Sequence, residues 1–351
     1  MTSAGSFKND YILRPVGPQI LKTVRHLGEF KGREALHTSQ APQALETLRE
    51  RAVIQSVESS NRIEGVVAPI ARLRQLVAEK TQPRDRPEQE IAGYREVLKT
   101  IHASARDIPF TPNVVLQFHR DLYQYLPVGY GGRWKGSDNT ITETTKSARV
   151  RVRFRPVPAF ETPASMKALH ERFNRLTESG EVDPLLLIPA YVLDFLCIHP
   201  FSDGNGRMAR LITLLLLYQA GYEVGRYISL EQIVERTKES YYEALEAASR
   251  GWHEGAHRIE GWWEYFLGVV LLSAYGEFEE RVGSISSARG AKADLVRDVI
   301  GRLPKMFRYA DVEQASPNVS RPTIQRVFAE MRTQGLIRCV KAGRDAVWQK
   351  V

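Results

Sequence analysis

The chain has 351 residues, with 49 Lys and Arg against 41 Asp and Glu and a formal net charge of +8. This length can form two or three domains with hydrophobic cores of their own. The chain has only two cysteines, Cys197 and Cys339, which argues against a disulfide framework and favours a reducing compartment. The first residues lack a signal-peptide pattern, and no apolar run approaches the ~20 residues of a membrane span. We therefore expect a cytoplasmic protein without a membrane partner.

The N-terminal part, residues 1–110, is predicted to be mainly helical. Residues 1–40 contain Pro15, Gly17 and Pro18, and we expect an extended arm there with one short helix around Gln19–Leu27. Three further helices are predicted to open at or near a proline, namely Pro69–Glu79, Pro87–Ala103 and Pro112–Leu126.

A long helix is predicted from about Pro42 to Glu64, closed by Gly65. Val53, Val57, Ser60 and Glu64 are spaced four, three and four residues apart, so they share one face. If this face points inward, the carboxylate needs a partner. The alternative is that Ser60 and Glu64 belong to a solvated helix end.

Two strands are predicted within the otherwise helical chain. Residues 138–142 precede a polar turn, and Arg149–Arg155 then alternates basic and apolar residues with period two. Such a hairpin is either a solvated edge protected by charge or a strand that pairs with a bound peptide. Its four arginines favour an acidic peptide.

The segment Ile198–Arg210 lies between two apolar runs that are predicted to be buried helices. Pro200 disfavours a helical conformation of His199, so the first helix should end just before this histidine. Gly204, Asn205 and Gly206 would open the second helix, where free N–H groups attract anions. Arg207 and Arg210 share a face of its first turn, although cations there oppose the helix dipole. We therefore expect an anionic ligand.

Two further residue types in this segment indicate the chemistry. His199 has an unperturbed pKa near neutrality and suits a general base. Asp203 can hold Mg²⁺, because one carboxylate together with ligand phosphates is a typical magnesium arrangement. A base, a metal carboxylate and a phosphate site together predict phosphoryl or nucleotidyl transfer.

The remaining helices are predicted to complete the central domain. They span residues 160–180, Leu230–Arg250 and Gly261–Ala274, and residues 284–291 have the composition of a linker. Tyr241 and Tyr242 lie on the second of these helices, where aromatic residues either belong to the core or line a pocket.

The C-terminal segment carries most of the net charge. Residues 286–351 hold 13 basic and 6 acidic residues, a net charge of +7. Three helices, Lys292–Arg302, Tyr309–Ala315 and Arg321–Thr333, precede a predicted hairpin. This pattern resembles a winged helix-turn-helix domain, which implies either DNA binding or a protein-interaction module.

The segment from His199 to Arg210 resembles the Fic family signature H-x-F-x-[DE]-G-N-G-R-x-x-R at every fixed position. Residues 60–65 also match the inhibitory pattern [ST]-x-x-x-E-[GN] of that family. The resemblance implies a mainly α-helical Fic fold with a β-hairpin flap, followed by the winged helix. We expect an N-terminal helical region over 1–110, a catalytic core over 111–285 and a C-terminal domain over 290–351.

The resemblance implies an enzyme that transfers AMP from ATP to a Ser, Thr or Tyr hydroxyl of a target protein and of itself. The implied nucleotide-binding residues are Gly204, Asn205, Gly206, Arg207, Arg210 and Tyr242. His199 would be the base, Asp203 would bind Mg²⁺, and Ser60 and Glu64 would be inhibitory through Arg210. Relatives that phosphorylate their targets tend to have a lysine in place of Gly206.

The expected partners are ATP, a target protein on the flap (residues 139–155), DNA or protein at the winged helix, and a second copy of the chain. Glu64 could also orient water for the removal of AMP. The alternative function is a DNA-binding regulator in which the Fic domain serves as a nucleotide sensor or a partner-binding body.

Overall fold

The computed structural model describes residues 5–8, 11–40, 42–144, 150–287, 291–316, 319–341, 343 and 346–351. Contacts divide the chain into two units, which we describe separately. The first comprises residues 1–31 and 48–276, and the second comprises residues 32–47 and 277–351. Among the described residues, no helix combines the length and the apolar composition needed to cross a membrane.

The chain is mainly helical, as predicted from the sequence. The helices before the hairpin are α1 (Pro18–Gln40), α2 (Pro42–Ile63), α3 (Ile70–Val77), α4 (Arg86–Ser104) and α5 (Pro112–Leu122), with the 3₁₀ turns η1 (Tyr11–Leu13) and η2 (Ala105–Asp107). After the hairpin come η3 (Ala159–Glu161), α6 (Thr162–Ser179), α7 (Pro184–Ile198), α8 (Asn205–Gln219), η4 (Val224–Arg226), α9 (Leu230–Arg236), α10 (Lys238–Ser249), α11 (Glu260–Trp263), the π-helical η5 (Glu264–Leu271) and α12 (Leu272–Ser287).

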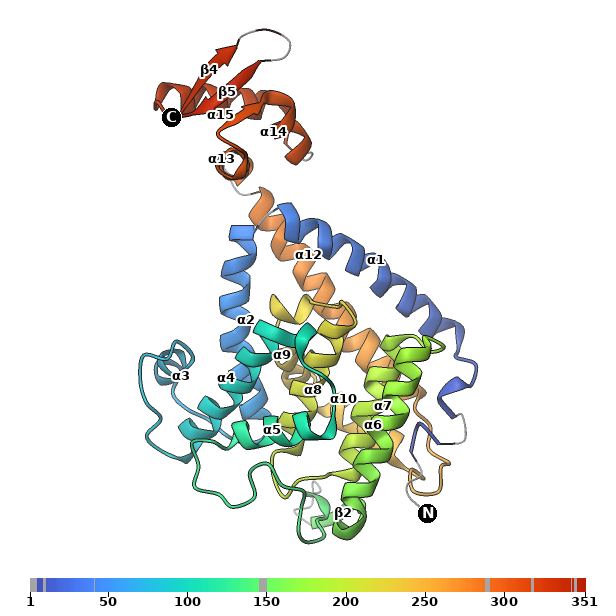
Figure 1. Cartoon of the computed structure of the whole chain (residues 1–351). Helices are drawn as coiled ribbons and strands as arrows, with labels where there is room; N and C mark the ends of the chain where they lie inside the picture. Colours follow the sequence, from blue (N-terminus) through green and yellow to red (C-terminus); the bar gives the residue numbers. More distant parts are fainter. Residues whose placement is uncertain are drawn as a thin grey trace. The chain divides into compact units, whose positions relative to one another are not determined.

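Helices α7 and α8 form the centre of the first unit. Every residue of α7 from Leu185 to Ile198 is buried, and the Asp183 side chain caps its start by accepting the Leu185 N–H at 2.8 Å. Helix α8 is packed against α4, α5 and α7 (Figure 1). The loop between α7 and α8 is therefore anchored at each end by a packed helix.

Helix α1 is much longer than the short helix predicted within residues 1–40. Its apolar side chains Ile20 and Leu27 are buried, and Phe30 stacks on Tyr275 with 5.4 Å between ring centroids. Glycines within a helix cost about 1 kcal/mol each, and such packing offsets that cost. The prediction of an extended arm was wrong for residues 18–40.

Two other predicted segments differ in the structure. The predicted helix Leu230–Arg250 is divided into α9 and α10 at Thr237, which has a non-helical ψ of 29° and donates its hydroxyl to Ile233 O at 2.8 Å. The Thr237 N–H also donates to Ile233 O, at 3.0 Å, so the division rests on its ψ and not on a lost helix bond. The predicted linker is helical as far as Ser287, because α12 continues to that residue, and residues 288–290 lie outside the described part.

The predicted hairpin is present. Strands β1 (Ile141–Thr144) and β2 (Val150–Phe154) pair antiparallel, with Thr142 opposite Val152. Residues 145–149 of the predicted flap lie outside the described part. Val150 and Val152 are 70% and 49% exposed, whereas Arg153 is half-buried. Exposure thus falls along β2 from Val150 towards Phe154, which lines a cavity together with Arg153.

The second unit includes the C-terminal elements in the predicted order. These are α13 (Ala291–Arg302), β3 (Met306–Arg308), α14 (Tyr309–Ala315), α15 (Arg321–Thr333), β4 (Ile337–Lys341) and β5 (Val347–Lys350). Strand β3 was not predicted, and it pairs with β5 in a sheet of order β3-β5-β4. The core around Val296, Ile300 and Phe328 holds these elements together.

Candidate active site

His199 follows the last residue of α7 and has a left-handed backbone conformation with φ 51°. Its N–H continues the helix pattern by donating to Phe195 O at 2.8 Å, and Pro200 prevents a further turn. The ring Nδ1 lies 3.3 Å from Leu196 O, so Nδ1–H donates and Nε2 is the basic nitrogen. Burial lowers the pKa of His199 to about 4, so the ring is neutral at pH 7.

The loop after His199 is fixed by three polar side chains. Asn205 closes it, because its Oδ1 accepts from Phe201 N–H at 2.9 Å and its Nδ2 donates to Phe201 O at 2.8 Å. Asn139 Nδ2 also donates to Phe201 O, at 3.0 Å. Lys135 Nζ bonds Asn139 Oδ1 at 2.8 Å and Ile198 O at 3.1 Å. Neither Lys135 nor Asn139 was predicted from the sequence to hold this loop.

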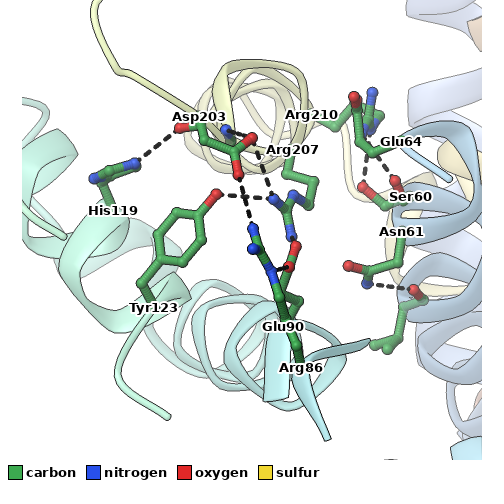
Figure 2. Close-up of polar contacts among 12 residues, drawn as sticks. Ser60, Asn61, Glu64, Arg86, Glu90, His119, Tyr123, Asp203, Arg207 and Arg210 are labelled. Carbon is green, nitrogen blue, oxygen red and sulfur yellow. Dashed lines mark hydrogen bonds and ion pairs between the residues drawn. The ribbon is translucent and has the colours of Figure 1, made fainter. Parts of the chain in front are cut away.

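Arg210 is directed from α8 towards the end of α2 (Figure 2). Its Nε donates to Ser60 Oγ at 2.8 Å, and its Nη2 donates to Ser60 O at 2.9 Å. Nη2 also lies 2.7 Å from Glu64 Oε1. The charge of this buried guanidinium is therefore balanced by Glu64.

Arg207 is directed from the same helix turn to a different set of partners (Figure 2). Its Nη1 lies 2.5 Å from Glu90 Oε2, and its Nη2 donates to Tyr123 OH at 2.9 Å. Arg86 Nε donates to the other Glu90 oxygen at 2.9 Å. Since Arg207 is 1% exposed, it is enclosed by this network. Glu90 and Tyr123 were not identified from the sequence.

Asp203 is the half-exposed acidic residue of the loop, with 46% of its side chain accessible. Its Oδ1 accepts from Gly204 N–H at 2.6 Å, and its Oδ2 lies 3.9 Å from Arg86 Nη2. The loop backbone is held at this point by His119, whose Nε2–H donates to Asp203 O at 3.0 Å. Within the described residues, no group of three or more metal-ligating side chains is present. Any metal here would need ligands from a substrate.

A cavity of about 400 Å³ brings several of the predicted residues together. Its lining includes His199, Gly206, Arg210, Glu64 and Tyr242. The other predicted residues lie outside this lining, namely Ser60, Asp203, Gly204, Asn205 and Arg207.

The Glu64 carboxylate lies directly over Gly206. A Cβ at position 206 would be 2.2 Å from Glu64 Oε1, too close for both atoms to keep these positions. Gly206 is therefore required for the close approach of Glu64 to the N-terminus of α8.

The two tyrosines of α10 have different surroundings. Tyr241 is buried and packs on Trp262 with 5.7 Å between ring centroids. Tyr242 is half-buried at the cavity, with Arg153 and Lys238 at 5.4 and 5.9 Å from its ring centroid. Only Tyr242 thus presents a partly open aromatic ring, and Tyr241 is mainly a core residue.

A model of the Fic/DOC family matches residues 109–217, a range that contains His199, Asp203 and both motif arginines. The Protein adenylyltransferase Fic of Drosophila erecta and that of Drosophila melanogaster are both 27% identical to the chain over 224 residues. These residues are 62% of this chain but 41% of each relative, so the match spans less than half of the relatives' length.

Two solved structures share the fold. A Fic family protein from Desulfovibrio desulfuricans superposes with a TM-score of 0.64 at 22% identity, over 96% of this chain and 97% of that one. A Fic domain-containing signalling protein from Bacteroides thetaiotaomicron gives 0.60 at 20% identity, over 74% and 97%. Residues 109–217 thus match the Fic/DOC family model, and the chain shares its fold with Fic family proteins.

Proposed function

We propose that the chain is a protein adenylyltransferase that transfers AMP from ATP to a Ser, Thr or Tyr hydroxyl of a target protein and of itself. The observation that carries this proposal is the shared cavity of His199, Gly206 and Arg210. It combines a neutral base with a helix N-terminus and a cation, which is the equipment for nucleotidyl transfer. The curated relatives named above support the same activity.

In the proposed reaction, His199 Nε2 takes the proton from the target hydroxyl. The hydroxyl oxygen forms a bond to the α-phosphorus of ATP, and the bond to pyrophosphate breaks. The N-terminal N–H groups of α8 and the Arg210 guanidinium would hold the phosphates. Arg207 would act differently from the prediction, because its partners Glu90 and Tyr123 make it a support of the loop.

The chemistry of Asp203 fits Mg²⁺ bound jointly with a nucleotide. A single half-exposed carboxylate beside a phosphate-binding helix terminus is a usual protein contribution to such a site. Mg²⁺, when bound there, would neutralise part of the phosphate charge.

We further propose that Glu64 inhibits transfer. Arg210 would have to exchange Glu64 for a phosphate, and the carboxylate over Gly206 would repel that phosphate. A charge-assisted bond of about 1.5–3 kcal/mol corresponds to a roughly ten- to hundredfold reduction of the productive population. The flap, residues 139–155, would meanwhile pair with a segment of the target protein.

The test compares wild type, Glu64→Gly, Arg210→Ala and the double variant, each with labelled ATP and the full-length chain as its own target. Glu64 follows the last residue of α2, so glycine should have little effect on that helix. We expect Glu64→Gly to raise transfer about ten- to hundredfold, and we expect no such rise in the Arg210→Ala background.

Glu58→Ala is the matched control, because Glu58 pairs with Arg62 elsewhere on α2. Activation by this control as well would point to a general loosening of α2. Equal transfer by wild type and Glu64→Gly would contradict the inhibitory role. Absence of transfer from every variant, in protein that binds ATP and offers hydroxyl-bearing targets, would contradict the activity itself.

A further inference from the structure

Arg153 on β2 lines the same cavity as His199 and Arg210. Its Nε atom is buried, and among the described residues no acceptor lies within hydrogen-bond distance of it. Burying a polar atom of a cation without a partner is unfavourable. This unsatisfied donor in a cavity lining therefore indicates that a ligand supplies the missing acceptor.

The other arginines of the site have protein acceptors, although Arg207 Nε is also buried without a partner among the described residues and lies outside the cavity lining. Arg210 bonds Ser60 and Glu64, and Arg207 bonds Glu90 and Tyr123. A phosphate that entered the cavity would compete with Glu64 for Arg210, whereas at Arg153 Nε it would displace no protein acceptor. A guanidinium is also well suited to phosphate, because its planar donors match two phosphate oxygens at once.

The position of Arg153 indicates which phosphate it would bind. Its guanidinium lies 5.4 Å from the centroid of the Tyr242 ring, one of the aromatic rings in the cavity lining. Because Arg153 lies over this ring, a nucleotide whose base enters the cavity beside Tyr242 would bring its first phosphate close to Arg153. Arg153 also shares this cavity lining with His199, the proposed base. The α-phosphate is the group that must lie near both the nucleoside and the base.

We propose that Arg153 of the flap is a catalytic residue that binds the α-phosphate of the nucleotide. This proposal rests on the adenylyltransferase function and adds a cation outside the family motif. Arg153 would neutralise negative charge on the α-phosphate as the target hydroxyl attacks, so it would contribute to nucleotide binding and to transfer. The flap would thereby form one wall of the nucleotide site.

Binding experiments test this proposal without transfer. The dissociation constants of adenosine, AMP and ATP are measured for full-length wild type, Arg153→Gln and Arg153→Lys by calorimetry, in protein whose fold is checked by circular dichroism. We expect Arg153→Gln to weaken AMP and ATP binding about ten- to hundredfold and to leave adenosine binding within about twofold, because adenosine has no phosphate. Arg153→Lys should restore part of the loss, since it keeps the charge but not the planar fork.

Arg151→Gln is the control from the same strand, because Arg151 is exposed and contacts Glu246 at 3.5 Å. It should leave all three constants nearly unchanged. Equal weakening of adenosine and AMP in Arg153→Gln would mean that Arg153 supports the Tyr242 ring, and it would overturn the proposal. The proposal would also be overturned if Arg153→Gln left all three dissociation constants unchanged and lost transfer only to acidic target proteins. Arg153 would then contact the protein substrate. The binding assay monitors no reaction, so it tests the role of Arg153 alone. The transfer assay with labelled ATP tests the adenylyltransferase function.

Discussion

His199 is a base whose protonation is controlled by its surroundings. Burial lowers its pKa from 6.5 to about 4, so the neutral form persists well below pH 6.5. A histidine in water would lose half of its basic form at about pH 6.5. The catalytic base of this site should therefore be insensitive to mild acid.

We predict that transfer by the Glu64→Gly variant stays constant from pH 8 to about 5.5 and falls with a midpoint below about pH 5. The measurement is a single-turnover assay after a short pH jump, with folding followed by circular dichroism. His199→Ala should bind nucleotide and show no transfer at any pH. A midpoint of the transfer rate near pH 6.5 would contradict the burial of the His199 ring.

At the residue scale, the motif side chains and the pairing of Glu64 with Arg210 could be predicted, whereas the partners of Arg207 could not. Residue types and spacing identified His199, Gly206 and Arg210, which line one cavity. Glu90, by contrast, looks like any solvated glutamate of a helix and lies 117 residues before Arg207. Only the packing of α4 on α8 brings this pair together, and it encloses an arginine that was predicted to face a phosphate.

At the element scale, strand β2 shows what periodicity can and cannot predict. The alternation of Arg and Val predicted a strand with two different faces, and the hairpin is present. Hydrophobicity alone would place the valines inside, yet Val150 is 70% exposed and Arg153 lines the cavity. Likewise, an apolar pattern does not reveal the non-helical ψ of Thr237 that separates α9 from α10.

The segment before the hairpin connects it to the catalytic loop. Asn139 donates to Phe201 O and accepts from Lys135, so it joins the start of the flap to the turn after His199. Burial lowers the pKa of Lys135 to about 8, which reflects its enclosure beneath the loop. This link should fix the position of His199 relative to the nucleotide.

We predict that Asn139→Ala lowers the rate of transfer about tenfold, while the dissociation constant of ATP changes less than about threefold. Loss of its hydrogen bonds should also reduce stability by about 1–2 kcal/mol. Kinetics in the Glu64→Gly background and thermal unfolding measure the two effects. Asn174→Ala is the control. Asn174 lies on α6, outside the cavity lining, and its side chain also donates to a backbone carbonyl, that of Phe110. Equal losses of transfer in both variants would show that Asn139 acts through stability alone.

At the scale of the whole molecule, the net charge, the three helices and the hairpin of the C-terminal segment were predictable, whereas strand β3 and the ligand were not. Residues 286–351 carry a net charge of +7. Part of this charge is paired internally, since Arg321 contacts Glu313 at 2.5 Å and Arg297 contacts Glu330 at 2.5 Å. DNA binding, a protein partner and a homodimer therefore remain predictions. The adenylyltransferase proposal does not depend on them.

Several histidines of the first unit are enclosed in their neutral form. Burial lowers the pKa of His102 to about 3 and the pKa values of His119, His170, His199 and His257 to about 4. The unfolded chain binds a proton at each of these rings as pH falls through 6.5, whereas the folded chain does not. Their contribution to stability is thus fully present above pH 6.5 and is lost as the pH falls towards 4.

We predict that the melting temperature falls steeply between pH 6.5 and 4.5, and that His170→Gln makes this fall shallower. His170 bonds Met166 O and Tyr191 OH, so the variant is less stable at pH 7.5. The variant also lacks one group that takes up a proton on unfolding, an uptake that lowers the stability of wild type by up to about 1.4 kcal/mol per pH unit. The difference in melting temperature between wild type and the variant should therefore shrink as the pH falls. Asn174→Ala on the same helix also loses a bond to a carbonyl but no titrating ring, and its deficit should be constant with pH. Thermal melts by circular dichroism at four pH values give the slopes. If the melting temperature of His170→Gln stayed below that of wild type by a constant amount over this range, His170 would take up no proton on unfolding. This result would contradict the lowered pKa of His170 in the folded chain.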